Sequence, residues 1–293
     1  MHVIAGTIPD KDFPLTFGEV LLEGDVLVIE GKKVLPLQGT GACIASAATV
    51  HQYLNTGATV KAVLVGDIGD GHGSRQLYSF LEKEVPNLSP RLIVLHYILP
   101  IMGMMKRVVA SCRRVPKLCL VADAGSMYAA KAAGLAKEFE VFTPDPSEMA
   151  FLADEKATHP AYISHHLLSS NHAVEKLIEK AHHYNNASRV MMIKGKKDYI
   201  VSDGAIKETI ENPDIPVLEA IGGTGDTITG VLSTFIYIGM ESWQACWAAG
   251  MTNRYAGMLL NPTPATKVSE LIGIFPRVFE ENLQQWSGIC TRI

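Results

Sequence analysis

The segment with the clearest potential for chemistry is 221–230, Ile-Gly-Gly-Thr-Gly-Asp-Thr-Ile-Thr-Gly, where three glycines precede an apolar helical pattern. Glycines let a backbone approach a ligand, and the unpaired N–H groups at a helix start favour anions. We therefore expect the N–H groups of Gly223, Thr224 and Gly225 to stabilise a phosphoryl group. Asp226 lies just inside the helix, where a carboxylate can take a proton from an attacking hydroxyl. The structural alternative is a glycine-rich loop with Asp226 as a first-turn capping residue.

Three cations follow another predicted strand, at Lys194-Gly195-Lys196-Lys197. The carboxyl end of a parallel strand is a natural site for nucleotide phosphates. These four residues, with Gly225, are therefore the predicted nucleotide-binding set. A solvated turn between two strands explains the same pattern equally well.

Two acids are placed at the corners between strands and helices. In the segment 142–148, Phe-Thr-Pro-Asp-Pro-Ser-Glu, two prolines fix the corner, so Glu148 falls in the first turn of the next helix. Glu148 could hold Mg²⁺ there, directly or through water, or it could simply complement the helix dipole. Asp123 also ends a predicted strand and could face the same crevice.

Other polar clusters carry weaker signals. Gly39-Thr40-Gly41 precedes the first clear helix and could form a substrate loop, but it lacks the full dinucleotide-binding fingerprint. Histidines concentrate between residues 159 and 183 without the spacing of metal ligands, so solvated helix ends are the preferred interpretation. The members of this group are His159, His165, His166, His172, His182 and His183.

The elements that must position these residues alternate between short apolar strands and helices. We expect strands at 26–30, 60–65, 91–95, 118–123, 140–143 and 190–194, and a hairpin at 198–202 and 205–210. We expect helices at 42–53, 74–83, 102–113, 127–137, 147–152, 173–184, 226–237, 242–259 and 267–284, with Pro276 interrupting the last. This order predicts a doubly wound α/β fold, with a mostly parallel sheet flanked by helices, as a single domain over 1–293.

Composition excludes several classes of protein. The 293 residues are 47% hydrophobic and 19% charged, with a formal charge of −4, which argues against disorder and against nucleic acid as a partner. The longest apolar stretch, 92–105, is too short to span a bilayer, and neither a basic amphipathic helix nor a secretory leader is visible. Five scattered cysteines indicate reduced thiols, so a cytoplasmic location without membrane contact is expected.

Taken together, the motifs resemble the ribokinase-like (carbohydrate kinase) superfamily. Gly223-Thr224-Gly225-Asp226 resembles its anion hole and catalytic aspartate, and the segment 143–148 resembles its Pro-Asn-x-x-Glu segment. Among its members the chain looks most like ADP/ATP-dependent NAD(P)H-hydrate dehydratase, in residues 24–29, in Lys194-Gly195 and in 222–230. The resemblance implies ATP or ADP with Mg²⁺, and it leaves a homo-oligomer open.

Departures from that family fall where it meets its substrate. Asp145 stands where the family has His, and the family's segment Asp-Ala-Asp is Asp123-Ala124-Gly125 in this chain. The resemblance therefore implies substrate roles for Asp145, Asp123 and Asp226, beside Gly39 and Gly41, while leaving the substrate itself open.

The expected reaction is phosphoryl transfer to the hydroxyl of a small molecule. In a hydrate dehydratase the phosphate ester is then eliminated, whereas in a sugar or vitamin-precursor kinase the ester is the product. A catalytically silent nucleotide-binding protein is the further alternative. Asp226 argues against it, because a pure binder needs the glycines and not the base.

Overall fold

A computed structural model describes residues 1–163 and 173–287 of the chain. Its strands form one eleven-stranded sheet in the order β11-β10-β9-β8-β7-β6-β1-β5-β2-β3-β4. The strands are β1 (His2–Ile8), β2 (Thr16–Glu23), β3 (Val26–Ile29), β4 (Lys32–Val34), β5 (Val60–Gly66), β6 (Leu92–His96), β7 (Cys119–Ala122), β8 (Val141–Phe142), β9 (Val190–Ile193), β10 (Asp198–Ser202) and β11 (Ala205–Ile210).

The centre of the sheet is parallel and its edges are antiparallel. Strands β9, β8, β7, β6, β1 and β5 pair in parallel, the hairpin β10–β11 adds to β9, and β2–β4 add to β5 as a meander. The predicted doubly wound α/β fold is therefore confirmed. The strand expected at 26–30 is β3, whereas β1, β2 and β4 were not expected from the sequence and complete the sheet.

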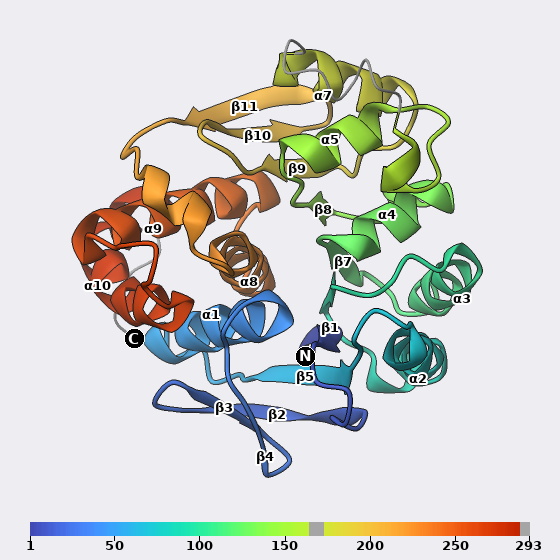
Figure 1. Ribbon diagram of the computed structural model, residues 1–293, viewed down its shortest axis with the longest axis horizontal. Helices are drawn as coiled ribbons and strands as arrows, with labels where there is room; N and C mark the ends of the chain where they lie inside the picture. The colour runs from blue at the N-terminus through green and yellow to red at the C-terminus, as the bar shows by residue number, and fades with distance from the viewer. Residues whose placement is uncertain (164–172, 288–293) are drawn as a thin grey trace.

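Helices cover both faces of the sheet, so strand residues alternate between two apolar cores. Helices α1, α8, α9 and α10 lie on one side of the sheet, and α2, α3, α4, α5 and α7 lie on the other (Figure 1). Ile4 of β1 belongs to the core on the first side, whereas Val3 and Ala5 belong to the core on the second. The helices are α1 (Gly39–Tyr53), α2 (His72–Leu88), α3 (Met102–Cys112), α4 (Gly125–Ala132), α5 (Pro146–Ala153), α7 (Val174–His183), α8 (Thr224–Tyr237), α9 (Ser242–Leu260) and α10 (Val268–Ser287), with 3₁₀ turns at Ala136–Glu138, Pro160–Tyr162 and Pro216–Ala220.

Three expected helices differ from the structure. The helix expected at 74–83 is longer, because α2 spans His72–Leu88 with Pro86 inside it. The predicted interruption at Pro276 is wrong: α10 runs on to Ser287, because the buried Phe275 and Phe279 on either side anchor it and outweigh the backbone hydrogen bond that proline cannot donate. The helix expected at 127–137 instead ends at Ala132, because Gly134 takes a positive φ of 71° and a short 3₁₀ turn follows. In the part of the chain that the structure describes, no helix has the length and apolar character needed to cross a membrane.

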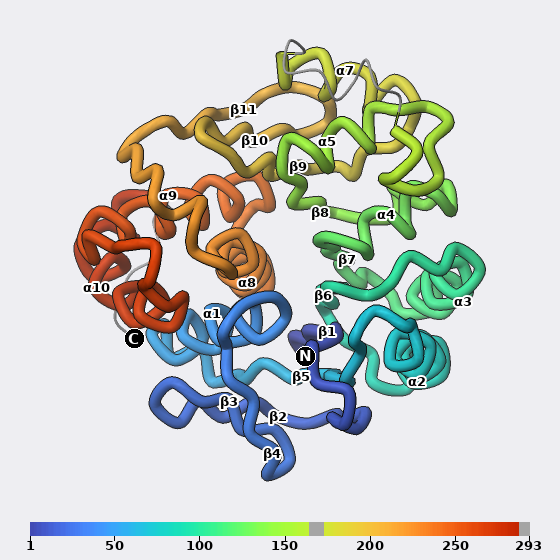
Figure 2. The backbone as a smooth tube through the Cα atoms, viewed as in Figure 1, coloured from blue at the N-terminus to red at the C-terminus, as the bar shows by residue number. Residues whose placement is uncertain are grey.

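Close packing of α1 on α8 depends on Gly230. The two helices lie side by side (Figure 2), and a Cβ at this position would collide with Ser46 and with the carbonyl oxygen of Cys43. We expect Gly230→Ala to lower the free energy of unfolding by about 1–3 kcal/mol, the usual cost of overpacking. Urea denaturation measures this value. The matched control is Gly273→Ala, at an exposed position inside α10 where a Cβ meets open space. This variant should raise the free energy of unfolding by about 0.5–1 kcal/mol, because alanine has a higher helix propensity than glycine. Equal effects at both positions would contradict the packing argument.

Candidate active site

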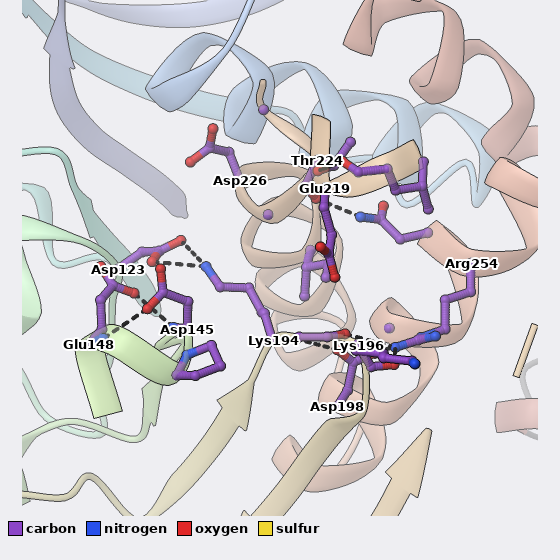
Figure 3. A pocket seen from close by; sticks show the side chains of 18 of the residues that line it. Asp123, Asp145, Glu148, Lys194, Lys196, Asp198, Glu219, Thr224, Asp226 and Arg254 are labelled. Carbon is purple, nitrogen blue, oxygen red and sulfur yellow. Dashed lines mark hydrogen bonds and ion pairs between the residues drawn. The ribbon is translucent and has the colours of Figure 1, made fainter. Parts of the chain in front are cut away.

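The predicted site residues gather where the central parallel strands end. His96 is the last residue of β6, Asp123 follows β7 and Lys194 follows β9, while the first turns of α1 and α8 face them. A cavity of about 770 Å³ opens at this edge of the sheet. Figure 3 shows Lys194 reaching across it toward Asp123, with Glu148 and Asp145 on one side and Arg254 with Asp198 on another. This is the edge at which open α/β sheets place their ligands.

The glycine-rich turn forms the start of α8. Gly223 precedes the helix with a φ of 98°, which explains why a glycine is needed there. The following N–H groups, including those of Thr224 and Gly225, have no acceptor within the helix and lie at the positive end of its dipole. Asp226 is buried in the first turn, and its Oδ2 accepts a hydrogen bond from the Gly39 N–H at 2.7 Å. The turn therefore offers anion-binding donors and a fixed carboxylate side by side.

A buried network of charges lies beside this turn. Lys194 Nζ donates to both carboxylate oxygens of Asp123, at 3.1 and 3.2 Å, and Thr229 Oγ1 donates to Asp123 Oδ2 at 2.7 Å. Burial alone would raise the pKa of Asp123, but the charges of Lys194 and His96 and the hydrogen bond from Thr229 lower it well below its usual range. The pKa of Lys194 is raised, because the surrounding carboxylates outweigh the cost of burying its charge. Both groups are thus ionised.

The proline corner forms a capping box at the start of α5. Asp145 accepts a hydrogen bond from the Glu148 N–H at 2.8 Å, and Glu148 Oε2 accepts one from the Asp145 N–H at 2.9 Å. Tyr128 donates to Glu148 Oε1 at 2.9 Å. Burial raises the pKa of Glu148 to about 7, and the charges of Asp123 and Asp145 add to this effect while Lys194 opposes it. The corner thus presents oxygen ligands of the kind that Mg²⁺ prefers.

The Lys-Gly loop is held from behind by a buried arginine. Arg254 Nε donates to Asp198 Oδ2 at 2.8 Å, and its Nη2 donates to the carbonyl oxygens of Gly195 and Lys196 at 3.0 and 2.9 Å. Asp198 in turn accepts a hydrogen bond from the Gly195 N–H at 2.9 Å. Lys194, Gly195 and Lys196 line the cavity. A single buried cation therefore fixes the shape of the loop.

Some predicted residues are placed elsewhere. Lys197 points away from the cavity and pairs with Glu211 at 2.8 Å. Gly41 packs against the backbone of the preceding loop, where a Cβ would press on Leu35 and Pro36. Gly39 contacts the site through its backbone N–H, which donates a hydrogen bond to Asp226 Oδ2.

The histidines of 159–183 show no ligand geometry where the structure describes them. His159 accepts a hydrogen bond from Ala161 N at 3.1 Å, and His182 and His183 lie in the last turn of α7. His165, His166 and His172 lie outside the described residues.

Three residues of the site are not among those predicted from the sequence. Tyr97 and Arg254 line the cavity, and His96 lies beneath it. The sequence contains features that could have indicated two of these residues. His96 ends an apolar strand beside strand-end acids, and Arg254 is the only charged residue of α9, so it needed a buried partner.

The sequence matches a family model and an uncharacterised relative. Residues 103–277, more than half of the chain, match the family model Carb_kinase, described as NAD(P)H-hydrate dehydratase. An uncharacterised protein of Methanocaldococcus jannaschii is 37% identical over 226 residues, which cover 77% of this chain and 93% of that protein.

Solved structures resemble the chain in fold. Phosphofructokinase-2 from Escherichia coli, in complex with potassium, has a TM-score of 0.55 at 11% identity, covering 94% of this chain and 98% of that one. Pyridoxal kinase from Entamoeba histolytica has a TM-score of 0.51 at 13% identity, covering 94% of both chains. Because this family model matches more than half of the chain, including the Lys-Gly loop and the glycine-rich turn, the chain belongs to the Carb_kinase family.

Proposed function

We propose that the protein transfers a phosphoryl group from ATP or ADP to a hydroxyl group of a small molecule. The observation that supports this most is the juxtaposition, in one cavity, of Asp226, the free N–H groups at the start of α8, and the cation Lys194, whose side chain is only 15% exposed. Membership of the family supports an enzyme of the phosphoryl-transfer or dehydratase type.

Each part has a defined task in this proposal. Asp226 takes the proton of the hydroxyl as its oxygen bonds to phosphorus and the bond to the nucleotide's bridging oxygen breaks. The N–H groups of Gly223, Thr224 and Gly225 stabilise the charge of the transferred group. Catalysis then consists mainly of positioning and electrostatics.

The nucleotide would lie along the Lys-Gly loop. Lys194, Gly195 and Lys196 face the cavity opposite Gly225, so the loop and the helix start could hold the phosphates between them. Glu148 and the neighbouring Asp145 form an all-oxygen donor set, which fits Mg²⁺. The ion would neutralise the charge of the nucleotide phosphates.

The identity of the hydroxyl substrate divides the proposal into two outcomes. A hydrate dehydratase would phosphorylate hydrated NAD(P)H and eliminate the ester, whereas a sugar or vitamin-precursor kinase would release it. Asp145 bears on this choice, because its side chain accepts hydrogen bonds from Glu148 N and Ser147 Oγ and serves the start of α5. The position where the family has His is thus occupied by a capping group, and we rank the dehydratase first on family membership alone.

The first test is to incubate the purified protein with hydrated NADH and Mg-ATP or Mg-ADP, following the return of the reduced-nicotinamide absorbance. We expect recovery that depends on the nucleotide. If the nucleotide binds and no absorbance returns, the kinase outcome is favoured, and a panel of hydroxyl substrates is tested for phosphorylation. Nucleotide binding without phosphoryl transfer to any acceptor, or to water, would contradict the proposal and favour a silent binding protein.

A further inference from the structure

One fully buried histidine joins the acids of the site. The side chain of His96 lies between the first turn of α1, the end of β7 and the first turn of α8. Its Nδ1 is 3.3 Å from Thr40 Oγ1, and its Nε2 is 3.3 Å from Asp226 Oδ1 and 3.5 Å from Asp123 Oδ2. Gly6, its neighbour in β1, leaves the space for this arrangement, because a Cβ there would collide with Thr40 and with the backbone of His96.

Hydrogen-bond accounting fixes the state of the ring. Thr40 Oγ1 lies 2.8 Å from the carbonyl oxygen of Thr7, which can only accept, so the hydroxyl hydrogen is committed there. The hydroxyl oxygen can then only accept from His96, and Nδ1 must carry a hydrogen. On the other side, Nε2 faces two carboxylates, which also only accept. These contacts are ion-pair distances of 3.5 and 3.3 Å, and Nε2 has no hydrogen-bond acceptor among the described residues. A neutral ring with its hydrogen on Nδ1 would turn the Nε2 lone pair toward two negative charges, so both nitrogens carry hydrogen.

We propose that His96 is an imidazolium that links Asp123 to Asp226 and acts as a positioning residue, holding the carboxylate of the candidate base in place. This proposal rests on the proposed function only for the role of Asp226, because the charged state of His96 follows from the contacts alone. Asp226 is thereby fixed from two sides, by His96 at Oδ1 and by the Gly39 N–H at Oδ2.

The charges around the ring agree with this assignment. Asp123 and Asp226 face His96 directly, and Lys194 forms an ion pair with Asp123 on the far side. The two other neighbours are uncharged: the centroid of the Tyr97 ring is 4.9 Å from that of His96, and the Thr40 hydroxyl contacts Nδ1. Burial opposes the charge of the imidazolium, but the two carboxylates outweigh this and raise the pKa of His96 to about 9. If Lys194 turns toward a nucleotide phosphate, His96 remains as the cation beside Asp123.

The direct test is NMR of the whole protein labelled with ¹⁵N-histidine, with the His96 signals assigned by their loss in His96→Gln. At pH 7.5 we expect both ring nitrogens of His96 to carry hydrogen. His51 serves as the reference in the same spectrum, since burial lowers its pKa to about 4 and it should be neutral. A neutral His96 at this pH would overturn the proposal, whatever reaction the protein catalyses.

A second pair of variants separates charge from folding. Thr40→Val removes the acceptor of the Nδ1 hydrogen and should lower the midpoint at which His96 loses its proton, while Thr40→Ser keeps the acceptor and should leave the midpoint in place. An unchanged midpoint in Thr40→Val would contradict the hydrogen-bond accounting. Divalent metal bound at one equivalent, detected by elemental analysis and lost in His96→Gln, would also overturn the proposal, because Nε2 would then hold a metal instead of a hydrogen.

The positioning role is tested on turnover. His96→Gln keeps a neutral donor near Asp226, and we expect kcat to fall about 10- to 100-fold through misplacement of the carboxylate, with KM for nucleotide nearly unchanged. In the wild type, activity should fall as the pH rises through about 9, and this fall should disappear in His96→Gln. A charged His96 in the NMR experiment, combined with unchanged kcat and pH profile in His96→Gln, would reject the positioning role. A protein with no turnover under any condition would instead reject the proposed function.

Discussion

Asp226→Asn is expected to abolish phosphoryl transfer while leaving nucleotide binding in place. The amide is almost the same size as the carboxylate and can still accept the hydrogen bond from the Gly39 N–H, but it cannot take a proton from a hydroxyl. Loss of a general base costs about 10²- to 10⁴-fold in rate. Turnover is measured with Mg-ATP and the accepted substrate, and the dissociation constant of a non-hydrolysable nucleotide is measured by calorimetry.

A control from the same cavity separates the base from simple loss of negative charge. Glu219 also lines the cavity, but it is exposed on the 3₁₀ turn that precedes α8. Glu219→Gln removes the same charge without touching the network around Asp123 and should change kcat less than about threefold, as surface substitutions usually do. If Asp226→Asn keeps the wild-type rate, or if both variants lose activity equally, Asp226 is not the base.

Some of this site could be predicted because strand ends converge. Asp123 and Lys194 each end an apolar strand, and the rule that parallel strands end at one edge of the sheet predicts that they share a crevice. The structure brings them into an ion pair at 3.1 Å. Likewise, glycines before an apolar helix predict an anion site without any knowledge of the sheet order. These inferences need only local pattern and the direction of the strands.

Other parts needed contacts between segments that are far apart in the sequence. His96 resembles an ordinary core residue until the fold places Asp123 and Asp226 against it. Lys197 stands in a run of cations, yet the bend that precedes β10 aims it at Glu211 and away from the cavity, and the local sequence pattern does not predict that direction. Strand β1, at the start of the chain, lacks polar alternation because both of its faces are buried, so its pattern carries little information.

Of the substitutions proposed for this protein, Arg254→Met is expected to cause the largest loss of stability, and it should also weaken nucleotide binding. The side chain of Asp198 is only 6% exposed, and without Arg254 it becomes a buried carboxylate with no ionic partner. Removing one member of a buried ion pair costs about 3–5 kcal/mol. Urea denaturation should show this loss. The control Arg277→Met removes the exposed i,i+4 pair with Glu281 and should change the free energy of unfolding by about 0.5 kcal/mol or less.

The pH dependence of this variant follows from the direction of one pKa. Burial already raises the pKa of Asp198, and Arg254 is the main influence that opposes the rise, so the pKa rises further in Arg254→Met. The folded variant then binds a proton that the unfolded chain releases near pH 3.9. Its stability should therefore fall as the pH rises from about 4 toward 7, by linkage. Adding Asp198→Asn removes the buried charge, and the double variant should recover stability at pH 7 and lose this slope.

Nucleotide affinity distinguishes local from global damage in Arg254→Met. Arg254 holds the carbonyl oxygens of Gly195 and Lys196, and neither the methionine variant nor the double variant can do so. In both we expect the dissociation constant for ATP to rise about 10-fold or more, equivalent to about 1.4 kcal/mol. Stability restored in the double variant without restored affinity would show that the arginine shapes the loop independently of its ion pair. Wild-type affinity in the double variant would instead mean that the nucleotide does not use this loop.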